Sequence, residues 1–433
     1  MKKLLTIGFA AAMMFAMAGK ASATPLETSG ELRARYWFLG NYVASGTNAE
    51  WWDSRLRLTL VWPVAENVKV TARADINEGF WGDRVETATT KTDSTTTPPT
   101  TTTTYAADNN TRPAVAWDQL NLSFVWPNTP ITIVVGRQTT TWGPGFFVSQ
   151  DHRDRFRIGA KVSDFNLFYT YGKYGEVGTL HETATLDDWS QHTIGFTSLM
   201  AGWNYGAIVA LVQNATTLNT EVSRWVVDGY GMGKVGPVDL KAEAVWGFGK
   251  DDNTGKPDVD ASGLGIYVGA TMPAGPVTAG LEFAYVAGDD PSTTDKNEGA
   301  FASDYQSPFW SIILFNSLDY NGYANESVTG PAPSDSGMKN AWGTKLSCSA
   351  APMQGLTLYG AAVYASRLED VKNATTGVVT PADPLGIEID ITATYAITPN
   401  VSWTVGGGYL VAGDFYGEAD NPFGLMSQFQ VKF

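Results

Sequence analysis

Residues 423–433 read Phe-Gly-Leu-Met-Ser-Gln-Phe-Gln-Val-Lys-Phe, and apolar and polar side chains alternate along them. Successive side chains of a β-strand point to opposite faces of its sheet. One face carries Phe423, Leu425, Phe429, Val431 and Phe433, and the other carries Met426, Gln428, Gln430 and Lys432. A strand that crosses a membrane in a barrel needs this alternation, because its residues face lipid and lumen in turn. The stretch therefore predicts an amphipathic strand of a membrane barrel.

The first residues of the chain predict export. Lys2 and Lys3 precede an apolar run at residues 4–18, and the small residues Ala-Ser-Ala follow at 21–23. This is the pattern of a secretory signal peptide, so we expect residues 1–23 to be removed. The run is too short for a spanning helix, and no later segment reaches the roughly 18 continuous apolar residues that such a helix needs. The mature chain is therefore either a soluble periplasmic protein or a barrel.

The charge and the cysteine content exclude several classes of protein. Without the three lysines of residues 1–23, the 29 Lys and Arg fall to 26 against 44 Asp and Glu, a formal charge of −18. A nucleic-acid partner is not expected, because phosphate contacts need an excess of Lys and Arg. The single cysteine, Cys348, excludes an intramolecular disulfide and is expected on the lipid-facing side of a strand. No metal or cofactor motif is present, so neither is predicted.

The alternation of the last residues recurs along the mature chain, at 55–62, 68–77, 240–248, 387–397 and 401–409. A helix would show a period of 3.6 residues instead of two. The repeated pattern therefore predicts many membrane strands and no helical domain.

Short and long connections alternate between these strands. The short ones are rich in Pro, Gly, Asn and Asp, which suit tight turns. They lie at 63–67, 127–130, 163–164, 201–204, 236–237, 273–276, 352–355 and 398–400. The long ones lie at 41–52, 78–113, 140–152, 173–188, 214–222, 250–260, 289–337, 368–385 and 413–421. Short periplasmic turns and long external loops are typical of such barrels. We predict an all-β fold, one antiparallel transmembrane barrel over residues 24–433, with 18 strands (16 being possible) and both termini periplasmic.

Two of the long loops have unusual compositions. Residues 87–104 are almost entirely Thr with two adjacent prolines. They cannot bury enough apolar surface to fold, so we expect a disordered external loop tip. Residues 301–323 are highly apolar, which is a liability on an exposed surface. We expect them to fold into the barrel mouth, or to pack against other loops or a partner subunit.

The inward faces of the predicted strands divide the lumen into two walls. The basic wall comprises Arg33, Arg35, Arg55, Arg57, Arg73, Arg153, Arg155, Arg157 and Lys161. The acidic wall comprises Asp239, Glu243, Glu282, Glu388 and Asp390. Arg137 lies on the same face of its strand as Ile133 and Val135, which are expected to face lipid. It therefore joins the basic wall only if a bulge shifts the strand.

The basic wall has two interpretations. Pairing with acids such as Asp53 would give a neutral lining, but the inward cations of the first six strands outnumber their acids by about three to one. Unpaired arginines in a narrow, partly desolvated lumen attract anions more strongly than they would on a surface. We therefore favour an anion-attracting ladder.

A constriction loop is expected near residues 140–152. The Gly-Pro-Gly run at 143–145 gives sharp turns, and the neighbouring aromatic side chains are too apolar to be left in water. The alternative is an external loop whose aromatics anchor at the membrane interface. We assign the constriction to Trp142, Pro144, Phe146, Phe147 and Asp151; inward folding would also place Gln138, His152 and Arg153 beside the basic wall.

The signal peptide, the amphipathic strands, the Gly-Arg-Gln and Trp-Gly elements at 136–143 and the terminal Phe433 together resemble a Gram-negative porin. The chain is most similar to large monomeric barrels of the alginate-export and carboxylate-channel type. The resemblance implies eighteen strands, an arginine-rich lumen, an outer-membrane location and passive diffusion of small or anionic solutes. It also implies that the barrel-assembly machinery recognises Phe433 as an assembly signal. The outer-membrane partners expected from it are lipid and lipopolysaccharide.

Three other functions remain open. A sugar channel would use a slide of lumenal aromatics, for which Trp37, Trp142 and Tyr359 are candidates. A barrel sheath for a partner protein would have an emptier and less charged lumen. An outer-membrane enzyme would need a Ser or His pair, and the only histidines are His152, His181 and His192; we predict no enzyme activity. The pattern does not distinguish a monomer from a homotrimer.

Overall fold

The computed structural model describes most of residues 25–433. The described residues are 25–41, 48–81, 85–93, 100–108, 115–175, 188–217, 220–253, 257–299, 307–315, 337–372, 377–417 and 420–433. The predicted signal peptide, residues 1–23, lies outside them.

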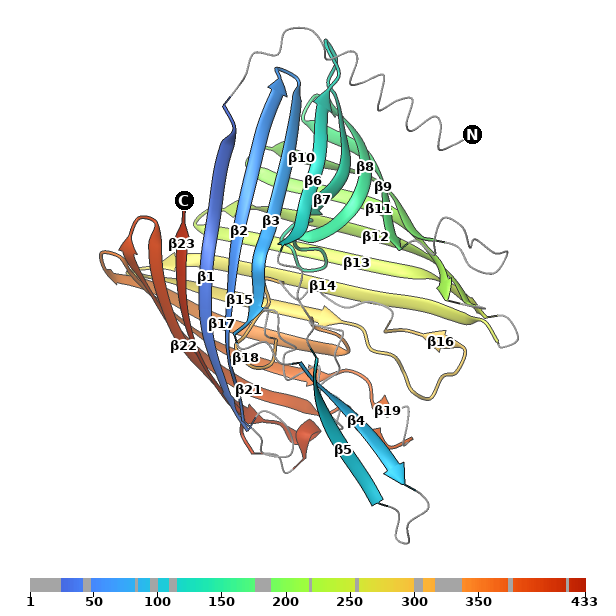
Figure 1. Cartoon of the computed structure of the whole chain (residues 1–433), viewed down its shortest axis with the longest axis vertical. Coiled ribbons are helices and arrows are strands. Elements are labelled where there is room, and N and C mark those ends of the chain that lie inside the picture. The colour runs from blue at the N-terminus through green and yellow to red at the C-terminus, as the bar shows by residue number, and fades with distance from the viewer. Residues whose placement is uncertain are drawn as a thin grey trace.

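Eighteen of the described strands form one closed antiparallel barrel, in which each strand pairs with the next and β1 pairs with β23 (Figure 1). They are β1 (Glu27–Gly40), β2 (Ala49–Ala65), β3 (Val68–Phe80), β6 (Val115–Val125), β7 (Ile131–Thr140), β8 (Asp151–Val162), β9 (Phe165–Gly175), β10 (Trp189–Met200), β11 (Trp203–Thr217), β12 (Thr220–Val235), β13 (Val238–Asn253), β14 (Val259–Ala274), β15 (Val277–Val286), β17 (Ala341–Met353), β18 (Leu356–Arg367), β21 (Pro384–Thr398), β22 (Val401–Ala412) and β23 (Phe423–Lys432). The prediction of an all-β barrel with eighteen strands is confirmed.

The alternation of faces is confirmed along the strands. On β14, Leu264 and Val268 are 40% and 45% exposed on the outer face, whereas Tyr267 between them is 2% exposed. Cys348 lies on the exposed outer face of β17 with Leu346, as expected. The eight turns and eight of the nine longer connections fall where the sequence places them. The ninth, predicted at 214–222, has only two residues between β11 and β12, because both strands extend into the predicted loop. No helix of the described residues is long and apolar enough to span a membrane.

The barrel closes where β1 meets β23. The ladder runs from the pair Glu31 and Lys432 to the pair Gly40 and Phe423. Beyond it, the backbone of Gly30 and Phe433 exchanges two hydrogen bonds of 2.7 and 3.0 Å. A side chain at position 30 would clash with the Phe433 ring, whose nearest atom is 2.4 Å from an ideal Cβ there. The glycine therefore lets the last ring lie against the first strand.

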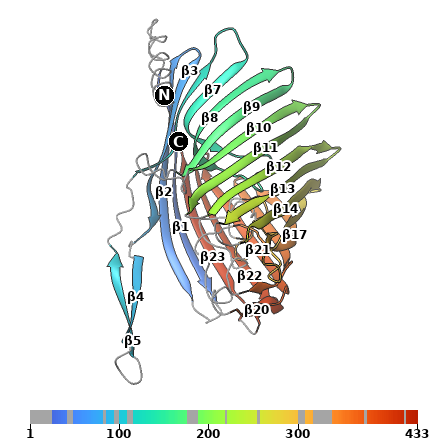
Figure 2. The same cartoon turned by 90° about the vertical axis from the view of Figure 1, so that its right-hand side faces the viewer.

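The tip of the Thr-rich loop, residues 94–99, lies outside the described residues. The described parts of the loop form an antiparallel hairpin, β4 (Val85–Asp93) and β5 (Thr100–Asp108), which stands apart from the barrel in Figure 2. Thr is β-branched and favours extended backbone, and a ladder of backbone hydrogen bonds needs no buried apolar surface.

The remaining elements are short. β16 (Lys296–Asn297) adds to β14 in parallel, β19 (Val371–Lys372) pairs with β20 (Val379–Thr380), and the 3-10 helix η2 spans Asp414–Tyr416. These elements lie in the long connections and leave the barrel ladder unchanged.

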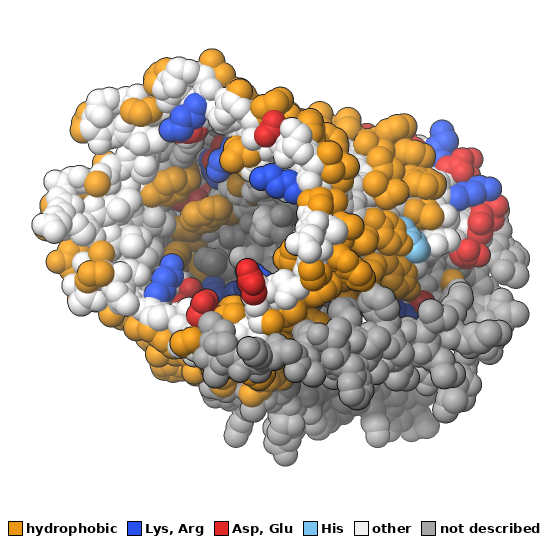
Figure 3. All heavy atoms as spheres, turned by 90° about the horizontal axis from the view of Figure 1, so that it is seen from above, with side chains coloured by type: hydrophobic (Ala, Val, Ile, Leu, Met, Phe, Trp, Pro, Cys, Tyr) orange, Lys and Arg blue, Asp and Glu red, His pale blue; other side chains and the backbone are white. Residues whose placement is uncertain are grey.

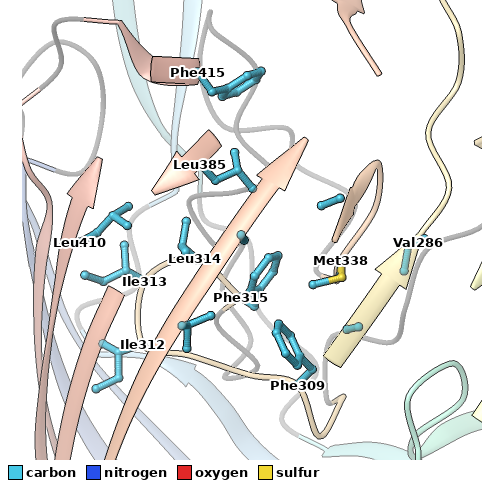
Figure 4. Packing of buried hydrophobic residues seen from close by; sticks show 14 of the residues in the cluster. Val286, Phe309, Ile312, Ile313, Leu314, Phe315, Met338, Leu385, Leu410 and Phe415 are labelled. Carbon is cyan, nitrogen blue, oxygen red and sulfur yellow. The ribbon is translucent and has the colours of Figure 1, made fainter. Parts of the chain in front are cut away.

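The apolar core of the molecule lies inside the barrel. Part of the apolar loop, residues 307–315, is buried among inward side chains of the strands (Figure 4). Ile312, Ile313 and Leu314 are at most 1% exposed. Of the expected alternatives, the described part of this loop folds inward; the rest of residues 301–323 lies outside the described residues.

Candidate channel lumen

The inward face of β1, β2 and β3 carries a chain of arginine–carboxylate contacts. Nε of Arg35 donates to Asp53 at 2.8 Å, and the guanidinium of Arg57 donates to both oxygens of Asp75 at 2.7 Å. Two further pairs on this face are Arg55–Glu31 at 3.1 Å and Arg33–Asp53 at 3.9 Å. We call the inward charged residues of β1, β2, β3, β6 and β8 the basic side.

Asp118 of β6 also belongs to the basic side, and the sequence analysis missed it. Arg73 donates to its carboxylate at 2.8 Å. The ladder of β3 with β6 is irregular next to Arg73, and Asp118 is buried while Trp117 and Leu120 are both about half exposed on the outer face. A bulge of this kind lets two successive residues turn inward. In the sequence, the signal for this bulge is the spacing of Trp117 and Leu120, which both face outward although they are three positions apart and a regular strand would need an even number.

β8 supplies the remaining arginines of the basic side. Arg155 donates to the carboxylate of Asp151 four residues earlier, and Arg153 pairs with the same carboxylate at 2.9 Å. The guanidinium of Arg157 lies 4.4 Å from the centre of the Phe168 ring. Such a contact stabilises a cation over the face of an aromatic ring without neutralising its charge.

Two other cations lie away from this network. Lys161 is exposed at the turn end of β8. Arg137 faces outward, 3.8 Å from Asp154, with side chains that are 38% and 67% exposed. β7 keeps its parity there, since Val135 is also exposed. The bulge that would have placed Arg137 in the lumen is absent from β7.

The loop between β7 and β8 enters the barrel interior and reaches β12 and β13. We call residues 141–150 the first inward segment. Nε1 of Trp142 donates to Asp228 on β12 at 3.0 Å, and the backbone amides of Phe146 and Phe147 donate to Glu243 on β13 at 3.0 and 3.3 Å. Glu243 is therefore covered by the segment, although the sequence analysis expected it to face the open lumen.

Local turn chemistry shapes this segment. Gly143 and Gly145 have φ of +52° and +82°, a region that side chains other than glycine rarely adopt. Pro144 lies between them, and the amide of Gly145 donates to the carbonyl of Trp142 at 2.8 Å. The turn directs Phe146 onto the ring of Tyr267, with centroids 5.2 Å apart and planes 19° apart. The Gly-Pro-Gly run and the aromatics thus dock the segment on β14.

Replacing Glu243 with Ala is expected to loosen the first inward segment and raise the single-channel conductance. A hydrogen bond to a charged group contributes about 1.5–3 kcal/mol. Losing even one such bond lowers the ratio of docked to released segment about tenfold or more. Conductance in planar bilayers measures the release. The control is Asp239→Ala on the same strand, because Asp239 is 44% exposed and contacts Lys234 at 3.2 Å near the turn. Equal conductance of both variants would contradict this anchoring role.

A second inward segment, residues 307–315, docks on β21 in a similar way. The amide of Ile312 donates to Asp390 at 3.2 Å. The amides of Ile313 and Leu314 donate to the two oxygens of Glu388 at 2.6 and 2.8 Å. Glu388 and Asp390, both expected on an open acidic wall, are 0% and 1% exposed.

The remaining acids of the expected acidic wall also have partners. Glu282 of β15 pairs with Lys345 at 3.0 Å and accepts the hydroxyl of Tyr267 at 3.0 Å. Nζ of Lys345 also donates to the carbonyl of Pro308 at 3.0 Å, which ties β17 to the second inward segment. Of the five predicted acids, only Asp239 is more than slightly exposed, and it lies at the turn end of β13.

The aromatics proposed for a sugar slide are separated. Trp37 is 1% exposed and stacks on Trp51, Trp142 is 6% exposed, and Tyr359 stacks on Trp310 of the second inward segment. They lie on β1, the first inward segment and β18. This arrangement does not give the continuous exposed track that a sugar slide needs.

The histidines do not form a pair in the described residues. Nε2 of His152 lies 2.9 Å from Arg73 and 3.4 Å from Asp118. Nδ1 of His192 lies 2.8 Å from the hydroxyl of Tyr169. His181 lies outside the described residues. Neither described site combines a histidine with a serine nucleophile.

The geometry thus gives the lumen two different walls. One is the basic side, and the other comprises the parts of β12–β14 and of β21–β23 that the two inward segments cover. Figure 3 shows a hollow with Lys, Arg, Asp and Glu side chains around it and apolar side chains on the outer wall. A barrel sheath for a partner protein was expected to have an emptier and less charged lumen. The described lumen instead contains two inward segments and many charged side chains.

Several solved structures share this fold, and one of them is described as a porin. OccK8 (OprE) of Pseudomonas aeruginosa has 10% identity and a TM-score of 0.53, covering 96% of this chain and 100% of its own. A BenF-like porin of Pseudomonas fluorescens Pf-5 has 11% identity and a TM-score of 0.54, covering 95% and 100%. OpdO of Pseudomonas aeruginosa has 12% identity and a TM-score of 0.54, covering 94% and 97%.

At these identities the likeness establishes the fold, which is the eighteen-stranded barrel of outer-membrane porins. The resemblance predicted from the sequence is confirmed at that level. Porin-like barrels are typically not enzymes. No protein-family model matches the chain, and no curated protein matches it.

Proposed function

We propose that the chain is an outer-membrane channel for the passive diffusion of small hydrophilic solutes, with a preference for anions such as carboxylates. The observation that carries the proposal is the charge of the basic side. Its described residues include eight arginines against five carboxylates. The arginines are Arg33, Arg35, Arg55, Arg57, Arg73, Arg153, Arg155 and Arg157, and the carboxylates are Glu31, Asp53, Asp75, Asp118 and Asp151.

The interleaved acids hold the arginines in place while leaving an excess of positive charge. Arginine presents a planar fork of donors that fits a carboxylate. A passing anion can therefore exchange hydrogen bonds with the more accessible of these arginines in turn. The side chains of Arg57, Arg73 and Arg153 are 16%, 15% and 39% exposed, whereas Arg35 is buried and adds only to the field. In a partly desolvated lumen this attraction is stronger than on an open surface.

The proposal includes a route to the membrane and a set of partners. Residues 1–23 would direct export, and the assembly machinery would recognise the last strand. The outward apolar faces would contact lipid and lipopolysaccharide. The first inward segment would set the narrowest part of the lumen.

The zero-current potential of the purified protein in a planar bilayer under a KCl gradient tests the proposal. We expect chloride preference, although the mature chain has a formal charge of −18, because the lumenal charge governs which ion passes. Preference for potassium would contradict the anion proposal and favour a general porin. The absence of conductance from a folded barrel would contradict the channel itself.

A further inference from the structure

Four inward carboxylates are covered although they face the interior of a membrane barrel. Asp228, Glu243, Glu388 and Asp390 are each at most 2% exposed. They lie on β12 and β13 and on β21, outside the strands of the basic side, and β22 and β23 separate β21 from β1. Their wall would be strongly acidic if nothing lay over it.

The groups that cover these carboxylates are backbone and indole N–H donors of the two inward segments. In the second segment, the consecutive amides of Ile312, Ile313 and Leu314 converge on Glu388 and Asp390. Consecutive amides of this kind form an anion-binding concavity. The occupant here is a pair of the protein's own side chains, so a cation in the lumen cannot reach these oxygens without displacing the amides.

We propose that the two inward segments withhold the negative charge of this wall from the lumen, so that a passing solute meets mainly the arginines. This inference rests on the proposed channel function and identifies what makes the basic side dominant. Distance, the N–H dipoles and salt screening weaken the attraction of a covered carboxylate for a passing cation. Uncovering the wall would add direct acidic contacts to the same pore.

The second segment packs its apolar side chains closely on the barrel strands, and substitutions in them leave the barrel ladder untouched. An ideal Cβ at Gly408 or at Gly424 would lie 2.9 Å from atoms of Ile312, which shows how closely the segment sits on β22 and β23. Phe309 and Phe315 pack on each other, with ring centroids 5.6 Å apart. The segment is not part of any barrel strand, so the closed ladder does not depend on it.

The test replaces the apolar side chains of the segment with serine, in the variant F309S/I312S/I313S/L314S/F315S. We expect its zero-current potential in a KCl gradient to shift toward potassium. Adding E388Q and D390N to this variant is expected to reverse most of the shift. The same two substitutions in the native chain should leave the sign of the potential unchanged, because the two charges do not face the native lumen.

A separate measurement reports whether the segment has left the wall. Val363 faces inward on β18, opposite Glu388, and is 0% exposed. In a Cys348→Ser background, a cysteine in place of Val363 should react slowly with a cationic thiol reagent in the native chain and quickly in the serine variant. Fast labelling with an unchanged potential would overturn the proposal. Slow labelling of the serine variant would also overturn it, because the packing described above would then not be what covers the wall.

The outcomes also separate this inference from the proposed function. If the native channel prefers potassium, the anion proposal fails. The covering role is then still judged by the difference between the native chain and the serine variant, and by its reversal with E388Q and D390N.

Discussion

Removing four arginines from the basic side is expected to turn a chloride-preferring channel into a potassium-preferring one. The four are Arg55, Arg57, Arg155 and Arg157. With serine at these positions, four arginines face five carboxylates instead of eight facing five. The effect exceeds the loss of positive charge alone, because Asp75 loses its partner Arg57 at 2.7 Å and Asp151 loses Arg155. The zero-current potential under a KCl gradient should therefore change sign.

Two controls isolate the charge. Four lysines at the same positions keep the positive charge and should keep the sign of the potential, although they lose the two-pronged contacts. Arg137→Ser removes one arginine that faces outward beside Asp154 and should not alter the potential. Inward polar substitutions affect selectivity more than stability, so heat-modifiable gel mobility should show folded barrels in all variants. An unchanged potential of the quadruple serine variant would contradict a basic side that controls selectivity.

Deleting Phe433 is expected to reduce the amount of assembled barrel severalfold. The deletion removes both backbone hydrogen bonds with Gly30, each contributing about 1 kcal/mol, and the ring that lies against that glycine. These contacts secure one end of the ladder that closes the barrel. The measurement is the heat-modifiable, folded fraction in isolated outer membranes, where the resemblance to porins also implies recognition of this residue.

Two substitutions separate the contributions of Phe433. Phe433→Ala keeps both backbone hydrogen bonds and removes only the ring. Phe429→Ala removes an outward aromatic of the same strand, which stacks on Trp403 with ring centroids 5.7 Å apart, and leaves the contacts of Gly30 intact. We expect the deletion to be the most damaging and Phe429→Ala the least. Normal folded amounts after the deletion would show that the barrel closes without these contacts.

The strands and their connections were predictable because their causes are local. A period of two along β14 or β23 decides which side chains face lipid, and Pro, Gly and Asn mark the turns. The eighteen-strand barrel follows from counting such segments. The inward parity of Arg35, Arg57 and Arg155 could be read in the same way.

The partners of the inward residues were not predictable, because they come from segments distant in sequence. Parity places Glu388 on the inner face, but it cannot show that amides 75 and 74 residues earlier will cover it. Asp118 was missed because a bulge breaks the parity of β6.

The ladder between β1 and β23 also affects the order in which the barrel can fold. It joins Glu31 to Lys432, 401 positions apart (432 − 31), whereas every other barrel ladder joins one barrel strand to the next barrel strand along the chain. In a free chain, bringing such distant residues together costs about 3 kcal/mol more than closing a ten-residue loop. The cost becomes small only if the intervening hairpins form first and curve the growing sheet, because β1 and β23 are then already close to each other. We therefore expect ring closure to be the last step of folding. Until then the first and last strands are open edges that can pair with another chain. The contacts at this junction therefore govern how long the molecule stays vulnerable to aggregation.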